Sequence, residues 1–138
     1  MPGWVLAGAL LLAGMPAIAA GLQDRFDAVA AAPGSHEILL ENDHIRVLRV
    51  SIAPGATEPV HDHRWASVMY FEQAQPITYI SYELVGTKPV EKARVDVAAE
   101  ALSAVETGDP EGLHAVRNRG THPFRALRVE LKDGRPGK

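Results

Sequence analysis

Cysteine is absent from the 138 residues of this chain. The protein therefore forms no disulfide and carries no thiolate nucleophile. It also offers no cysteine ligand for zinc and no cysteine for lipid attachment. These kinds of chemistry are excluded whatever the fold, although the absence of cysteine does not by itself indicate a cellular compartment.

Basic residues are neither abundant nor clustered. Lysine and arginine number 14 against 17 aspartates and glutamates, for a formal net charge of -3. Because phosphate binding needs concentrated positive charge, we expect no nucleic acid partner. The sequence also lacks a glycine-rich phosphate loop, a long amphipathic helical pattern and an internal repeat. What is left is a single domain of ordinary globular composition, with 46% hydrophobic and 22% charged residues.

The N-terminus carries the longest apolar segment. Residues 4–20 are apolar throughout, and small residues at Ala17 and Ala19 match the pattern of a signal peptidase site after Ala19. A transmembrane anchor is the alternative, but two glycines and a proline interrupt a segment that is already marginal for crossing a bilayer. We expect a cleaved signal peptide over residues 1–19 and a periplasmic or secreted protein with no stable membrane span after cleavage.

The rest of the chain divides into three parts. Residues 20–35 are predicted to form an N-terminal arm, either a short helical turn or an extended segment. Residues 36–132 are predicted to form the folded domain. Residues 133–138 are rich in glycine and proline and are predicted to be a flexible tail.

The folded domain reads as a series of short β-type runs separated by turns rich in Gly, Pro, Asn and Asp. Strands are predicted over residues 37–40, 45–52, 57–63, 65–71, 77–84, 90–97, 98–105, 113–117 and 124–132. The run 98–105 is ambiguous because its alanines and leucine also favour a helix. Short strands with turn signals every eight to twelve residues or so predict an all-β sandwich or barrel.

Two histidines, His61 and His63, are the centre of the functional hypothesis. Side chains two apart on a strand share a face, so these imidazoles project together while Asp62 points to the opposite side. A pair of imidazoles on a rigid strand is half of a transition-metal site. His114, some fifty residues later, is the candidate for completing it. The alternative is an exposed polar pair near a strand edge.

The spacing around these histidines resembles the two sequence motifs of cupins. The first motif places a glycine about five residues before His-x-His, as Gly55 precedes His61 here. The second motif is matched in order by Gly108, Pro110, Gly112, His114 and Asn118, with one residue fewer than usual before the histidine. The resemblance covers about residues 37–132 and is to small, exported, single-domain cupins. It implies a double-stranded β-helix, the jelly-roll barrel of that superfamily.

The resemblance also implies a metal site, with one departure. Cupins hold a metal with three histidines and one glutamate, but Ser67 and Val68 stand where that glutamate is expected. His61, His63 and His114 are then the predicted ligands of a divalent transition metal: iron, zinc, manganese or copper. Without the carboxylate such a site carries more positive charge, which favours an anionic substrate or hydroxide.

Three functions are consistent with these residues. The first is a periplasmic metal-dependent cupin that acts on a small molecule with dioxygenase- or isomerase-like chemistry. The second is a non-enzymatic cupin that binds a small ligand or a metal. The third is a metal-free structural or partner protein. The resemblance also implies a homodimer paired through strand edges.

Other side chains are expected to be structural. Asn118 is expected to hold the turn before Gly120 rather than bind a ligand. Solvent exposure is expected for His36, His44, His122 and Glu106. Core or cavity-wall positions are expected for Trp65, Met69, Tyr79 and Tyr82.

Overall fold

The computed structural model describes residues 24–134, which consist mainly of β-strands. The strands are β1 (His36–Glu41), β2 (Ile45–Ile52), β3 (His61–His63), β4 (Ala66–Gln73), β5 (Ile77–Val85), β6 (Lys88–Val97), β7 (Val105–Gly108), β8 (Glu111–Asn118) and β9 (Phe124–Leu131). The helices are α2 (Ala28–Ala31) and the 3-10 helix η1 (Ala99–Ala101). The signal peptide predicted over residues 1–19 lies outside the described residues. Within residues 24–134, no helix has the length and apolar character needed to cross a membrane.

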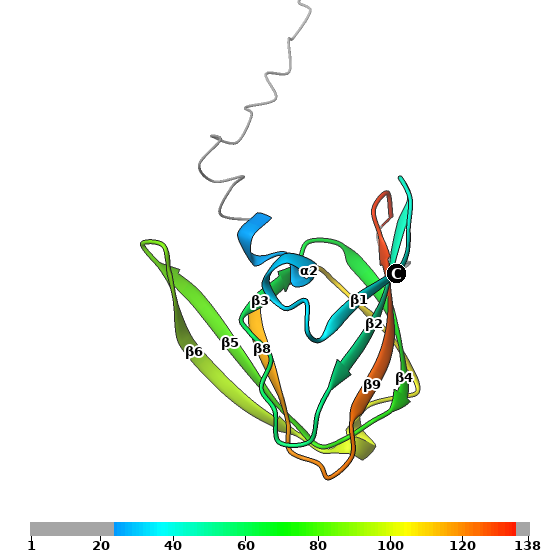
Figure 1. Ribbon diagram of the computed structural model, residues 1–138. Coiled ribbons are helices and arrows are strands. Elements are labelled where there is room, and N and C mark those ends of the chain that lie inside the picture. The colour runs from blue at the N-terminus through cyan, green and yellow to red at the C-terminus, as the bar shows by residue number, and fades with distance from the viewer. Residues whose placement is uncertain (1–23, 135–138) are drawn as a thin grey trace, which may run out of the picture.

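Two sheets face each other and form the barrel (Figure 1). One sheet has the strand order β1-β2-β9-β4-β7 and the other has the order β3-β8-β5-β6. All paired strands in both sheets are antiparallel. Neighbours in each sheet are often distant in sequence, because the chain passes repeatedly from one sheet to the other as in a jelly roll. The predicted all-β, jelly-roll architecture is confirmed.

The prediction of a strand over residues 98–105 is wrong. Ala99–Ala101 forms the 3-10 helix, and β7 begins only at Val105. Alanine prefers helical to extended backbone, and this preference decides the local structure here. The helical turn also lets Leu102 pack against the apolar core of the barrel.

The interior of the barrel changes from apolar to charged along β2 and β9. The facing residues of the two strands are, in order, Ile52 with Phe124, Val50 with Ala126, Leu48 with Arg128 and Arg46 with Glu130. All eight side chains are buried. The first two pairs belong to the apolar core cluster. The last pair places two opposite charges inside the protein.

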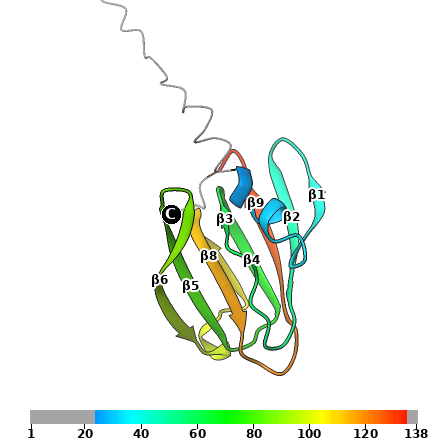
Figure 2. The same cartoon turned by 60° about the vertical axis from the view of Figure 1, so that its left-hand side comes forward.

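Buried ion pairs connect the charged end of the barrel to the N-terminal segment. Arg46 donates from Nη1 and Nη2 to the two carboxylate oxygens of Asp27, at 3.0 and 2.9 Å, and from Nε to Glu130. Asp27 also accepts a hydrogen bond from the backbone N–H of Val29 and so caps α2. The short helix contacts β1 and β3 (Figure 2). The part of the predicted arm that the structure describes is therefore packed against the barrel.

Replacing Arg46 with methionine leaves Asp27 and Glu130 buried without their shared cation. We expect the free energy of unfolding to fall by about 3–5 kcal/mol, the usual cost of removing one partner from a buried ion pair. Arg49→Met is the matched control on the same strand, because the Arg49–Glu37 pair is exposed. That change should alter stability by less than about 1 kcal/mol. Urea denaturation measures both, and equal losses in the two variants would contradict the prediction.

Candidate metal centre

The three histidines singled out in the sequence come together inside the barrel. His61 and His63 share the inner face of β3 and are 0% and 2% exposed. His114 lies on β8 directly opposite His61 in the strand register. The ring centroids are 4.4 Å apart for His61 and His114, 5.1 Å for His61 and His63, and 5.5 Å for His63 and His114. The expected convergence is confirmed, whereas metal binding by these residues stays a prediction.

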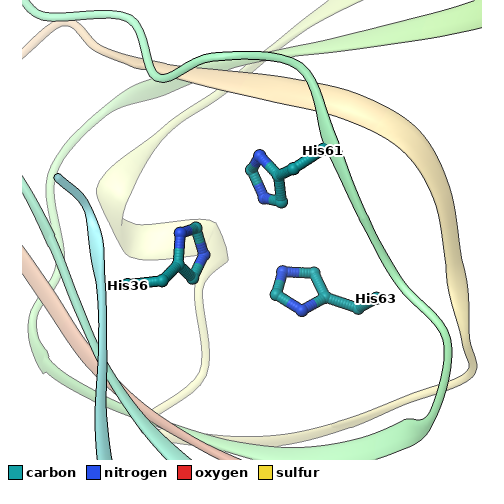
Figure 3. Close-up of side chains that lie close together, drawn as sticks. All are labelled: His36, His61 and His63. Carbon is teal, nitrogen blue, oxygen red and sulfur yellow. The ribbon is translucent and has the colours of Figure 1, made fainter. Parts of the chain in front are cut away.

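A fourth histidine, His36, joins this cluster, and its expected solvent exposure is wrong. His36 begins β1, is 4% exposed, and points toward His61 and His63 (Figure 3). Its ring centroid lies 4.6 Å from that of His61 and 5.3 Å from that of His63. The turn after α2 places the His36 side chain inside the barrel. No local sequence pattern indicates this position. His44 and His122 are exposed, as predicted.

Each of the four rings is oriented by a hydrogen bond at Nδ1. The acceptors are the carbonyl of Pro59 for His61 (2.8 Å), the carbonyl of Gly112 for His114 (2.8 Å), the carbonyl of Ala32 for His36 (3.2 Å) and the carboxylate of Glu130 for His63 (2.7 Å). Carbonyl and carboxylate oxygens can only accept, so Nδ1 carries the proton and Nε2 keeps its lone pair. The Ser35 hydroxyl also lies 3.0 Å from His36 Nδ1, but it donates to Glu58 and so accepts from this ring. This is the arrangement found in metal-binding histidines, whose second nitrogen is held by a carbonyl or carboxylate.

Burial keeps these imidazoles neutral. Burial lowers the pKa of His36 to about 4 and that of His61 to about 2. It also lowers the pKa of His63 and of His114, and the nearby Arg128 guanidinium acts in the same direction. A neutral imidazole is the form that binds a metal, so no proton has to leave these rings near pH 7.

Besides Glu130, two glutamates lie beside the histidine cluster. Glu58 Oε1 is 3.8 Å from His61 Nε2, and Glu111 Oε2 is 4.0 Å from His114 Nε2. Burial raises the pKa of Glu58 to about 7, although the Ser35 hydroxyl and the Val116 backbone N–H both donate to its carboxylate. Neither glutamate occupies the motif position. Ser67 stands there, fully buried on β4 and paired in register with Glu130.

Three overlapping sets of possible ligands exist within residues 24–134. The sets are His36, His61 and His63; Glu58, His61 and His114; and His63, Glu111 and His114, each with its ligand atoms within 4.8 Å of one another. His61, His63 and His114 each belong to two of these sets but do not form one by themselves. The three histidines predicted from the sequence are therefore the residues that these sets share, and three further possible ligands, His36, Glu58 and Glu111, were not predicted.

The donor set fits a transition ion. Nε2 of His61 is buried and has no hydrogen-bond partner among the described residues. It faces neighbouring imidazoles whose nitrogens are the ligands that zinc, copper, iron and nickel prefer. Beside the cluster lies a cavity of about 410 Å³, with Met69 and Tyr79 in its wall as predicted. The Tyr79 ring stacks on His114 at 4.9 Å between centroids.

Asn118 has the structural role expected of it. Its amide group donates to the carbonyls of Ile52 and His122, and its side-chain oxygen accepts from the N–H of Gly120 at 2.8 Å. These bonds close the turn between β8 and β9. Glu106 accepts from the backbone N–H of Ser103 and lies at the cavity wall, so it is less exposed than expected.

Solved structures share this architecture. Neither a family model nor a curated protein matches the sequence. The chain is similar to a cupin domain from Bordetella pertussis Tohama I, with a TM-score of 0.53 and 16% identity over 70% of this chain and 91% of that one. The chain has a cupin fold. At this identity the likeness to that cupin domain establishes the fold alone.

Two further cupins are similar at lower TM-scores. A cupin superfamily protein from Desulfitobacterium hafniense DCB-2 has a TM-score of 0.45 and 17% identity over 71% of this chain and 76% of its own. An RmlC-like cupin with a double-stranded β-helix from Methanocaldococcus jannaschii has a TM-score of 0.45 and 10% identity over 70% and 77%.

The metal-free protein is expected to lose stability as the pH falls below about 6.5. The folded protein keeps His36 and His61 neutral, because their pKa values are about 4 and about 2, whereas the unfolded chain binds protons near pH 6.5. Each such histidine lowers the free energy of unfolding by up to ~1.4 kcal/mol per pH unit below that point. Urea denaturation in EDTA from about pH 8 to about pH 5 measures the slope. His36→Asn should reduce it by about one such increment, and His122→Asn, at an exposed position, is the control variant.

Glu58 acts in the opposite direction. Its pKa of about 7 in the folded protein exceeds the ordinary value of 4.5, so the folded state holds an extra proton between these pH values. Its contribution to stability therefore falls as the pH rises through this window. Glu58→Gln should make the dependence on pH steeper, and a shallower dependence in this variant would contradict the assignment.

Proposed function

We propose that this protein is a periplasmic cupin that binds a divalent transition metal through His61, His63 and His114 and acts on a small molecule. The observation that carries the proposal is the buried cluster of neutral imidazoles, each held at Nδ1 so that Nε2 keeps its lone pair. Burying His61 Nε2 without a hydrogen-bond partner costs stability, and a bound metal would supply the missing partner.

Iron, zinc or copper suits the imidazole ligands, and manganese suits the carboxylates of Glu58 and Glu111 beside them. When bound, such an ion supplies Lewis-acid chemistry at a substrate oxygen or activates water or O2, which supports a dioxygenase- or isomerase-like reaction. The chain's own residues have separate parts in this scheme. Glu130 holds the His63 ring, and His36, Glu58 and Glu111 are within reach as further ligands. The apolar wall of the cavity limits the access of water to bound substrate.

A non-enzymatic cupin that binds a small ligand is the second candidate. The cavity of about 410 Å³ favours it, because its wall is largely apolar with polar groups gathered at one end. A metal-free partner protein, and a homodimer, also stay predictions.

Metal content is the decisive measurement for the proposal. The mature protein purified without chelator should hold a near-stoichiometric transition metal, and His114→Ala should lose it because His114 is one of the three proposed ligands. Retention of the metal in this variant would point to the set of His36, His61 and His63 instead. His122→Ala is the matched control, since that histidine is exposed. Absence of metal from the wild-type protein, even after reconstitution with iron, zinc, manganese and copper, would rule the proposal out.

Enzyme and binding protein are distinguished by His61→Ala. If the protein is an enzyme, metal and turnover disappear together in this variant. If it is a binding protein, a ligand raises the melting temperature of the wild type without forming product.

The proposed location has its own test. We expect protein isolated from the periplasm of an expressing Gram-negative host to begin at Ala20, because the small residues at Ala17 and Ala19 form the cleavage pattern. N-terminal sequencing of the soluble periplasmic fraction measures this. Recovery in the membrane fraction with residues 1–19 intact would favour the transmembrane anchor instead.

A further inference from the structure

Arg128 is a buried cation on the inner face of β9, and the metal site leaves it unused. The side chain is 3% exposed. Its Nη1 donates to Glu111 Oε2 at 2.6 Å and lies 3.5 Å from the sulfur of Met69. Its Nε and Nη2 are buried and have no hydrogen-bond partner within residues 24–134. The nearest carboxylate to Nε is that of Glu130, at 3.7 Å, and it already accepts from His63.

The two unpartnered nitrogens have a specific geometry. The N–H of Nε and one N–H of Nη2 lie along the same edge of the planar guanidinium and point in nearly the same direction. This fork matches the two oxygens of a carboxylate. Buried donors are paired in the great majority of native structures, since leaving one unpaired costs about as much as a lost hydrogen bond. An anion with two coplanar oxygens would satisfy both donors of Arg128 at once.

The cavity beside Arg128 has two chemically different parts. One part is formed by Arg128, the four clustered histidines and three glutamates, Glu58, Glu106 and Glu111. The remaining wall is mostly apolar and includes Val50, Ile52, Phe71, Val97, Val116 and Phe124. The volume of about 410 Å³ is near the lower end of the range for small-molecule sites, roughly 300–1,000 Å³. The space therefore suits a compact ligand that has one polar end.

The other carboxylates that line the cavity with Arg128 accept from donors of their own, Glu106 from the backbone N–H of Ser103 and Glu58 from Ser35 and Val116. Glu111 binds the other side of the guanidinium through Nη1, and its own side chain is 31% exposed, so water screens part of its charge. The histidines facing the cavity are neutral, and Glu130 is shared between His63 and Arg46. Arg128 is thus the only arginine or lysine among the described residues that line the cavity.

We propose that the cavity binds a small carboxylic acid with an apolar body, whose carboxylate pairs with Nε and Nη2 of Arg128 and whose body lies against the apolar wall. This inference names the ligand class of the same site and rests on the proposed function only for the claim that the ligand is a substrate. Binding itself requires no metal.

Calorimetric titration of the metal-free wild-type protein tests this without any mutation. The probes are hexanoate and benzoate, each compared with its neutral amide of nearly the same shape, hexanamide and benzamide. We expect each acid to bind with one-to-one stoichiometry and at least about tenfold more tightly than its amide, because charge-assisted bonds to a guanidinium are the stronger kind. Acetate has the same head without the apolar body and should bind more weakly than either acid.

Variants at Arg128 test the residue itself. Arg128→Met should weaken binding of the acids at least about tenfold and leave binding of the amides unchanged. Arg128→Lys keeps the charge but loses the fork, so its affinity should fall between those of wild type and Arg128→Met. Arg125→Met is the control, because Arg125 is exposed on the opposite face of the same strand. Circular dichroism confirms that each variant is folded before titration.

Three results would overturn the inference: equal affinity for acid and amide in the wild type, no binding of either acid, or full affinity in a folded Arg128→Met variant. Metal content is measured on the same preparation before chelation. Bound metal without preference for the acids would refute this inference alone. Preference for the acids in a protein that never takes up metal would refute the proposed metal site alone.

Discussion

The site depends on one repeated interaction, the donation of a histidine Nδ1–H to a fixed acceptor. An imidazole with no such partner can rotate and can carry its proton on either nitrogen. Here a backbone carbonyl two residues earlier orients both His61 and His114, so the strand geometry itself sets the direction of their rings. The consequence is a group of Nε2 lone pairs gathered in the interior of the barrel.

The other two rings depend on the N-terminal segment. His36 donates to the carbonyl of Ala32, just after α2, and is placed directly by that segment. His63 is held by Glu130, which pairs with Arg46, which in turn pairs with the capping residue Asp27 of the same helix. The N-terminal segment must therefore pack against the barrel for His36 and His63 to be oriented as they are. A short helix with little stability of its own is stabilised by the same charges.

The sequence predicted the parts of the site that follow local rules. Strand periodicity placed His61 and His63 on one face, and β2 was predicted with the bounds that the structure shows. The place of His36 in the cluster was not predicted, because this residue precedes the motif by many positions and its location depends on the path of a turn. The burial of Arg128 and Glu130 was not predicted for a different reason. Alternation divides β9 into two faces but does not say which is inside, and here the face with two charges is buried. Arg46 and His63 pair with Glu130, and Glu111 pairs with Arg128. These pairs offset the free-energy cost of burying the two charges.

The balance of these charges links the proposed metal to the proposed ligand. Arg46 and Arg64 lie against Asp27, with Glu130 bound to Arg46, and Arg128 is paired with Glu111. The fixed charges nearly cancel, and the four imidazoles add none. A divalent cation placed among these rings would thus add positive charge that the surrounding ion pairs do not neutralise. Glu111 is already paired with Arg128, so the groups in reach that can balance this charge are the carboxylate of Glu58 and an acid bound in the cavity. A glutamate at position 67 would have supplied that charge permanently. With serine there, a bound acid would supply part of it, so metal and acid would each favour binding of the other.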